Sequence, residues 1–309
     1  MFAVRAHSRD SPLVYEEVPR PSPGAGEALV RVVAAGITPG ELSWTPTWSD
    51  RAGHDRTPTI PSHELSGVVE ELGHGVTHVA IGDAVMGLIP FDLDGAAAEY
   101  AIVRARDVAP KPGSVDHLHA AAIPLSGLAA WQALTEQSSV KAGDRVLIHG
   151  GAGGVGCFAV QIAHELGAKV FATASDRDVD FVHDLGADSV IDYRRERFED
   201  AVPNVDIVID TVGGDVMVRS FEVLRPGGTL VTIAGRPPPV TSRRSDIEVR
   251  FFIVEAFRGH LVEMARLAEA GRLRTFVDRV FPLAEAASAY EYALTGHPRG
   301  KVILDVVLC

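Results

Sequence analysis

A glycine-rich run from Gly150 to Gly156 contains the residues best suited to hold a phosphate group. It has the spacing G-x-G-x-x-G at Gly151, Gly153 and Gly156, directly after an apolar segment, residues 145–149. Between a strand and a helix, this spacing permits a tight turn, close approach of backbone to a pyrophosphate and close packing of the helix on the strand. Glycine-rich turns also occur for purely steric reasons. We predict a dinucleotide site that includes Gly151, Ala152, Gly153, Gly154, Val155 and Gly156.

The residues after the next two predicted strands bear on the choice between NAD and NADP. An NAD site usually places an acidic residue at the end of the second strand, where it binds the ribose 2′-hydroxyl. Here that strand ends at Ser175, Arg177 follows, and Tyr193 comes after the third strand. These side chains suit a 2′-phosphate, so we predict NADP(H), although Asp176 and Asp178 add repulsion. The alternative is that Ser175 caps the next helix and Arg177 is a solvated charge.

An alternation of apolar strands and helical segments begins near residue 124 and is typical of a doubly wound parallel sheet, the α/β Rossmann architecture. Helical patterns cover residues 155–166, 176–185 and 259–270. The predicted strands are residues 145–149, 169–174, 189–192, 206–210, 229–233 and 249–254.

The first 120 residues have a different pattern, with short β-rich runs at 28–34, 65–72, 84–88 and 99–103 that are broken by Gly and Pro. This pattern predicts a twisted antiparallel or barrel-like sheet. The apolar strand at 302–308 has no helix after it, so we expect it to return to that sheet. The sequence thus predicts a β-rich substrate domain, residues 1–123 and 273–309, and a nucleotide domain, residues 124–272.

The composition of the 309 residues narrows the function classes. Hydrophobic residues make up 46% and charged residues 23%, the balance of a folded globular protein. The formal net charge of -12 opposes binding to nucleic acid, which depends on clustered Lys and Arg. Two cysteines, Cys157 and Cys309, are too few for a disulfide framework, and the uncharged stretch 120–135 is shorter than the roughly 20 residues of a membrane helix. We expect a cytoplasmic protein with no membrane partner, in which Cys157 is a small buried residue.

Several motifs resemble the medium-chain dehydrogenase/reductase superfamily, within it the zinc-independent quinone oxidoreductase (zeta-crystallin-like) branch. They are residues 62–69 (SHELSGVV), 82–85 (GDAV), 128–134 (LAAWQAL), 187–193 (ADSVIDY) and 300–304 (GKVIL). The resemblance covers essentially the whole chain in order. It implies a GroES-like substrate domain, a Rossmann domain that binds NADPH, and a homodimer formed through an edge strand. We assign three further residues to the cofactor site: Ala234, Gly235 and Lys301.

Members of this superfamily differ in whether they bind a catalytic zinc ion. Zinc-dependent relatives have a Cys where this chain has Thr38, and they use the His that corresponds to His63. A lone His beside Glu64 lacks the soft ligands of a tetrahedral zinc site, so we expect no metal and a structural role for both residues. Quinone oxidoreductases commonly have Asn at the position of Thr38, whose hydroxyl still donates a hydrogen bond. We assign Thr38 as the catalytic residue, and water as the source of the second proton.

The acceptor pocket is predicted to be aromatic. Trp44 and Trp48 lie in a segment, residues 43–61, that is typical of a loop, and Phe252 lies near the end of the sixth strand. Aromatic rings stack on planar molecules, although a phenylalanine in a strand is also a core residue. The sequence predicts NADPH-dependent hydride transfer to a planar quinone or α,β-unsaturated carbonyl. The alternatives are an enoyl-thioester or polyketide-tailoring reductase, and a non-catalytic NADPH-binding sensor.

Overall fold

The computed structural model describes residues 1–237 and 244–307. Contacts between Cα atoms divide the chain into two compact units. Unit 1 comprises Met1–Leu128 and Glu255–Cys309, and unit 2 comprises Ala129–Val254. The helix α3 (Pro124–Gln132) contains the first boundary between them.

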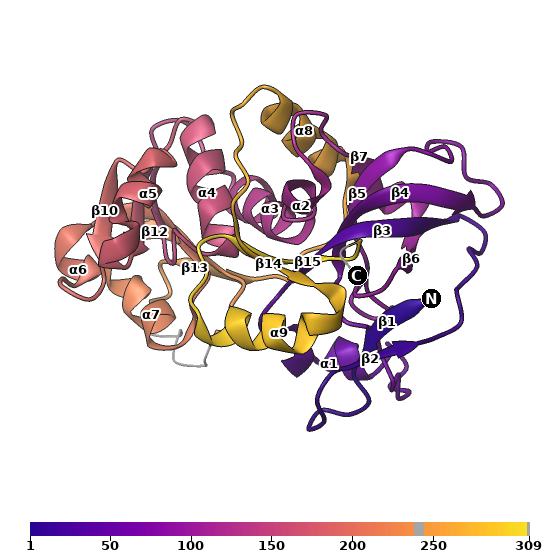
Figure 1. The fold of residues 1–309 in the computed structure, drawn as a ribbon. Coiled ribbons are helices and arrows are strands. Elements are labelled where there is room, and N and C mark those ends of the chain that lie inside the picture. The colour runs from indigo at the N-terminus through magenta and orange to yellow at the C-terminus, as the bar shows by residue number, and fades with distance from the viewer. Residues whose placement is uncertain (238–243, 308–309) are drawn as a thin grey trace. The chain divides into compact units, whose positions relative to one another are not determined.

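Unit 2 is built on a six-stranded parallel sheet with the order β10-β9-β8-β11-β12-β13. Helices α4 and α5 lie over one face of this sheet and α6 and α7 over the other (Figure 1). The strands are β8 (Arg145–Ile148), β9 (Lys169–Ala174), β10 (Ser189–Asp192), β11 (Val205–Asp210), β12 (Leu224–Thr232) and β13 (Glu248–Phe251). The helices are α4 (Gly154–Glu165), η4 (Asp176–Asp178), α5 (Val179–Asp184), α6 (Phe198–Ala201), α7 (Gly214–Arg219) and η5 (Ser220–Glu222), preceded by a π-helical turn, η3 (Ala133–Gln137).

This topology confirms the predicted doubly wound sheet. The strand order reverses beside β8, which is where open parallel sheets bind their ligands. β12 begins at Leu224 rather than at residue 229, and β13 ends at Phe251 rather than at residue 254.

Unit 1 contains a seven-stranded, mostly antiparallel sheet with the order β14-β15-β3-β4-β5-β7, to which β6 adds by pairing with β3. A separate antiparallel pair joins β1 to β2. The strands are β1 (Phe2–Arg5), β2 (Val14–Glu17), β3 (Glu27–Ile37), β4 (Glu64–Leu72), β5 (Ala84–Leu88), β6 (Tyr100–Arg104), β7 (Val108–Pro110), β14 (Val277–Pro282) and β15 (Lys301–Asp305). The helices are η1 (Glu41–Ser43), α1 (Thr45–Trp48), η2 (Ala105–Asp107), α2 (His117–Ala120), α8 (Arg258–Glu269), η7 (Leu283–Glu285) and α9 (Ala286–Thr295).

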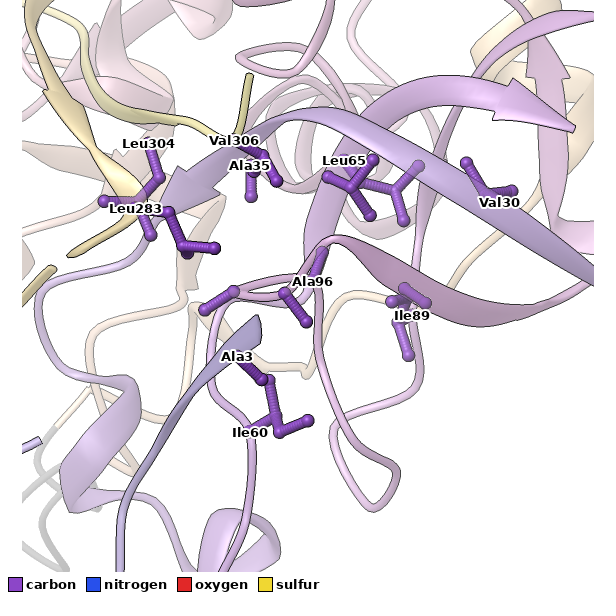
Figure 2. Packing of buried hydrophobic residues seen from close by; sticks show 14 of the residues in the cluster. Ala3, Val30, Ala35, Ile60, Leu65, Ile89, Ala96, Leu283, Leu304 and Val306 are labelled. Carbon is purple, nitrogen blue, oxygen red and sulfur yellow. The ribbon is translucent and has the colours of Figure 1, made fainter. Parts of the chain in front are cut away.

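The core of unit 1 joins residues from distant parts of the sequence. Figure 2 shows members of this core from the central strands (Val30 and Leu65), from the residue after β5 (Ile89) and from the C-terminal segment (Leu283 and Leu304). β15 pairs antiparallel with β3, which confirms that the last predicted strand returns to this sheet. Of the predicted strand 302–308, residue 308 lies outside the described residues, as does Cys309.

The observed units differ from the predicted domain bounds in residues 124–128 and 255–272. The second segment contains α8, which the sequence prediction gave to the nucleotide domain. In the structure α8 belongs to unit 1, where its buried Met264 lies directly against Gly127. Among the described residues, no helix has the length and apolar character required to cross a membrane.

Candidate functional site

The turn between β8 and α4 has the shape of a phosphate-binding loop. Gly150 has a φ of +71°, which is accessible to glycine at little cost. A Cβ on Gly156 would overlap the carbonyl oxygen of Gly150, so the helix packs against the turn only with glycine there. Around Gly153 there is more room, since the nearest atom to an added Cβ would be 3.4 Å away. α4 begins after Gly153 without any side-chain cap, so its first N–H groups are available to an anion.

Two buried side chains that the sequence analysis missed hold this turn. Thr173 Oγ1 accepts from the Gly150 amide at 3.1 Å and lies 3.2 Å from His149 Nδ1. The other ring nitrogen of His149 is 2.9 Å from Ser220 Oγ. Burial lowers the pKa of His149 to about 4, so the ring is neutral at neutral pH. Its position directly before the glycine run was the available sequence signal.

The residues predicted to bind a 2′-phosphate gather at the ends of β9 and β10. Ser175 stands at the N-cap position of η4, where its hydroxyl donates to Asp178 Oδ2 at 2.7 Å and makes no bond to the helix backbone, so the position expected by the capping alternative is observed without the backbone cap bond. Arg177 Nε donates to the same oxygen at 3.2 Å, while its side chain remains 56% exposed. Tyr193 is exposed, and the guanidinium of Arg194, which the sequence analysis did not select, lies 5.8 Å from its ring centre. This edge therefore presents two arginines and a phenol to solvent.

The predicted residues Ala234 and Gly235 follow β12 at the same edge of the sheet. Ala234 is exposed, and no atom lies within 4 Å of a Cβ position at Gly235. The neighbouring turn after β11 is fixed by Asp210, whose carboxylate accepts from the amide of Gly213 at 2.9 Å and from Thr232 Oγ1 at 2.9 Å. The glycine turn, Ser175 and Ala234 thus follow β8, β9 and β12 at the same carboxyl edge of the sheet.

In unit 1, Thr38 lies directly after β3. Its amide donates to Glu41 Oε1 at 3.2 Å, and its hydroxyl oxygen is buried without a hydrogen-bond partner among the described residues. Glu41 is 1% exposed, and Tyr290 OH donates to it at 2.6 Å. Burial raises the pKa of Glu41 to about 7, against the opposing effect of the Tyr290 hydrogen bond.

The structure corrects the cofactor role predicted for Lys301. Its side chain is 4% exposed, with Nζ 2.5 Å from Glu64 Oε1, and it donates to the carbonyl of Ile37 at 2.7 Å. An ammonium group committed in this way is not available to a phosphate. Burial raises the pKa of Glu64, and the attraction of Lys301 opposes that rise. Glu64 is thus a structural acid, as expected from the sequence.

His63 is also buried, and its Nδ1 has no hydrogen-bond partner among the described residues, so the structural role expected for it stays a prediction. Its ring packs edge-on against Phe91, with centroids 5.3 Å apart. Nε2 lies 3.9 Å from Glu41 Oε2, too far for a hydrogen bond. Burial lowers the pKa of His63 to about 3, so at neutral pH its neutral ring faces the Glu41 carboxyl group.

The two tryptophans of the 43–61 segment have different surroundings. Trp44 is half-buried and packs edge-on against Phe91 at 5.0 Å, an aromatic residue that the sequence analysis missed. Trp48 is 7% exposed, and its indole N–H donates to Leu42 O at 2.8 Å. Trp48 is therefore a packing residue within unit 1, which corrects its predicted place in a pocket wall. Phe252 is half-buried in unit 2, just beyond β13.

The segment 43–61 is not a simple loop, because it contains α1. Arg56 fastens it: one guanidinium nitrogen donates to Pro46 O at 2.5 Å and to Thr47 O and Phe91 O, both at 3.2 Å. This residue fixes the segment that carries Trp44 to the segment that carries Phe91.

A parallel sheet of this strand order, with a glycine turn and an uncapped helix after its first strand, is typical of a dinucleotide-binding domain. Comparison with known proteins specifies the class. The chain belongs to the medium-chain dehydrogenase/reductase superfamily, in its quinone oxidoreductase branch. Three family descriptions match it: alcohol dehydrogenase GroES-like domain over residues 24–113, zinc-binding dehydrogenase over 185–304, and alanine dehydrogenase/PNT C-terminal domain over 130–215.

Three individual proteins show the range of relatives. The chloroplastic NADPH-dependent alkenal/one oxidoreductase of Arabidopsis thaliana is 32% identical over 289 residues, which cover 90% of this chain and 72% of that protein. The quinone oxidoreductase structure from Coxiella burnetii has 34% identity, a TM-score of 0.90 and 99% coverage of both chains. The CurK enoyl reductase structure has 27% identity, a TM-score of 0.85 and 98% coverage of both chains. This chain is an oxidoreductase of an NAD(P)-dependent family.

Proposed function

We propose that the protein is a zinc-independent reductase that transfers a hydride from NADPH to a quinone or an α,β-unsaturated carbonyl compound. The observation that carries this proposal is the buried hydroxyl of Thr38, which has no partner among the described residues. A buried donor without a partner is costly, and a ligand oxygen would satisfy it. The names of the alkenal/one and quinone oxidoreductase relatives support the same acceptor classes.

NADPH would supply the hydride, and the residues of this chain would bind and orient the reactants. When a hydride adds to the electrophilic carbon of an enone, the electron pair of the double bond moves toward the carbonyl oxygen. The Thr38 hydroxyl would donate to that oxygen and stabilise the developing charge. Water would then supply the one proton that the resulting enolate needs, at the carbon next to the carbonyl group, which completes the saturated product.

The residues of unit 1 do not fit a catalytic zinc. A tetrahedral site needs three or four converging Cys, His or acidic ligands. The described part of the chain contains no group of three or more such residues placed to hold a metal. Near Thr38, Glu41 is bound to Tyr290, and Glu64 is paired with Lys301, so His63 would be the only uncommitted ligand. We therefore assign the activation of the carbonyl to hydrogen bonding.

We propose NADPH rather than NADH because of the residues after β9 and β10. Arg177 and Tyr193 supply donors of the kind that a 2′-phosphate requires, and Arg194 adds a positive charge. The hydroxyl of Ser175 would join them by turning from Asp178, to which it donates in the structure. Gly151, Ala152, Gly153, Gly154, Val155, Gly156, Ala234 and Gly235 complete the proposed cofactor contacts. For the acceptor we propose Trp44, its neighbour Phe91, and Phe252.

The test is NADPH and NADH oxidation at 340 nm by chelator-treated protein with a panel of quinones, enones and enoyl thioesters. Turnover of quinones or enones that survives chelation, with preference for NADPH, is the expected result. Preference for enoyl thioesters would support the tailoring-reductase alternative instead. Tight NADPH binding without turnover of any acceptor would support a sensor, and activity that requires one equivalent of zinc would overturn the metal-free proposal.

We also propose a homodimer and a cytoplasmic location. β13 is an edge strand of the unit 2 sheet and can pair with a second copy. The low number of cysteines fits a reducing compartment, whereas one relative is named chloroplastic. Light scattering of the purified protein and cell fractionation test these two assignments.

A further inference from the structure

Gly36, Ile37 and Thr38, at and just after the end of β3, are each held by a buried side chain. Ser62 Oγ donates to Gly36 O at 2.8 Å, and Lys301 Nζ donates to Ile37 O at 2.7 Å. The amide of Thr38 donates to Glu41. The backbone that leads to Thr38 is thus held by a hydrogen bond at each of residues 36, 37 and 38, whereas the Thr38 hydroxyl itself has no partner among the described residues.

Glu41 connects these contacts. One carboxylate oxygen accepts from the amide of Thr38 and from the Tyr290 hydroxyl, and the other accepts from the amide of Ser62 at 3.0 Å. Tyr290 belongs to α9, is 249 residues away from Glu41 in the sequence, and is 3% exposed. Three segments of unit 1 therefore meet on one carboxyl group.

This arrangement is unfavourable for the free energy of the folded state. Burial of a carboxyl group is unfavourable even when it is hydrogen-bonded, and apolar residues of similar volume often stabilise a core more. Ser62 also has a φ of +69°, an uncommon conformation for a residue other than glycine. Costs of this kind persist where they hold a functional group in place. Thr38, with its unpartnered hydroxyl, is the functional group in contact with Glu41.

We propose that Glu41 and Tyr290 are positioning residues that hold the Thr38 backbone so that its hydroxyl is preorganised to donate to the acceptor carbonyl. The proposal rests on the function proposed above, in which Thr38 contacts the acceptor. Glu41 and Tyr290 act through Thr38 and do not touch the reacting atoms.

A double-mutant cycle tests this coupling with Tyr290→Phe and Thr38→Val, both of which nearly conserve volume. Tyr290→Phe should lower kcat about fivefold, the effect of one lost hydrogen bond, with KM for NADPH unchanged. Thr38→Val should lower kcat by about 10- to 100-fold. In the Thr38→Val background, Tyr290→Phe should have no further effect on kcat, because the hydroxyl that it positions is gone. Tyr292→Phe is the matched control. Tyr292 belongs to the same helix, α9, and its hydroxyl donates to Asp278 of β14 in an exposed hydrogen bond.

Amide hydrogen exchange provides a readout that is independent of turnover. Protection of residues 36–41 should fall in Tyr290→Phe and not in Tyr292→Phe, whereas unchanged protection would overturn the positioning role. Effects on kcat that are additive in the cycle would overturn the coupling to Thr38. If wild-type protein reduces no quinone or enone, the proposed function fails and the catalytic part of the inference fails with it. The exchange result then still decides whether Glu41 and Tyr290 order the backbone.

Discussion

Gly156 and Gly150 approach so closely that a Cβ on the first would overlap the carbonyl oxygen of the second. Gly156→Ala should therefore force the turn or α4 to move, with a loss of about 2 kcal/mol in the free energy of unfolding and of most NADPH binding. Gly153→Ala is the matched variant, because its added Cβ would meet only an ordinary contact at 3.4 Å. It should keep the wild-type Tm and still bind NADPH about tenfold more weakly, because the methyl group would obstruct a pyrophosphate. Thermal unfolding and fluorescence titration measure both. Equal Tm values for the two variants would contradict the packing role of Gly156.

Replacement of Arg177 should change the choice of cofactor. Arg177→Ala should lower kcat/KM for NADPH about tenfold through loss of a charge-assisted hydrogen bond, and leave kcat/KM for NADH unchanged. Arg266→Ala is a control, since Arg266 is an exposed arginine of unit 1 that pairs with Glu263. Equal losses with both cofactors would show that Arg177 supports the fold rather than the 2′-phosphate.

The two tryptophans of the 43–61 segment should respond differently to truncation. Trp48→Ala removes a buried side chain and should cost about 3 kcal/mol in the free energy of unfolding. Trp44→Ala should cost less than about 1.5 kcal/mol and raise KM for bulky quinones about fivefold, because it removes the ring that packs on Phe91. Urea unfolding and steady-state kinetics separate the two effects. A larger change in acceptor KM for Trp48→Ala would restore the original pocket prediction.

Glu41 should make the stability of the protein depend on pH. Burial raises its pKa from 4.5 to about 7, so between these values the folded state binds the proton that the unfolded state has lost. Its contribution is thus fully present below pH 4.5 and is lost as the pH rises through about 7. The buried His63 and His149 have lowered pKa values and act in the opposite sense as the pH falls below about 6.5.

The comparison of wild type with Glu41→Gln removes those histidine contributions. The difference in free energy of unfolding, wild type minus variant, should fall between pH 4.5 and pH 7 and then level off. Urea unfolding across this range gives the difference directly. A difference that is flat with pH would mean that Glu41 titrates normally in the folded protein.

The sequence predicted the nucleotide half of the fold well because its signals are local. Parallel strands covered on both faces appear as near-continuous apolar runs, and β9 and β10 have the predicted bounds. By contrast, β2 and β14 are largely exposed and carry little apolar pattern, so the sequence analysis missed them. β7, with three residues, is too short to give a periodic signal. β1 was also missed, and its burial pattern does not alternate.

The buried side-chain contacts of unit 1 could not be predicted, for a different reason. Whether Lys301 faces a phosphate or Glu64 depends on which strand lies beside β15, and the two residues are far apart in sequence. The same applies to Tyr290 and Glu41. Trp48 looked like a pocket residue by type, and only the packing around its indole ring shows that it is buried.

The position of β15 between β14 and β3 has a consequence for the order of events during synthesis. Unit 2 is contiguous in sequence and can fold while later residues are still being translated. Unit 1 must wait, because closing the loop from β3 to β15 brings together residues as far apart as Ile37 and Val302. Until β15 leaves the ribosome, β3 lacks one neighbour and Glu64 lacks its lysine. The nascent chain should therefore complete unit 2 before it completes the sheet of unit 1, so that chaperones encounter an open edge of β3.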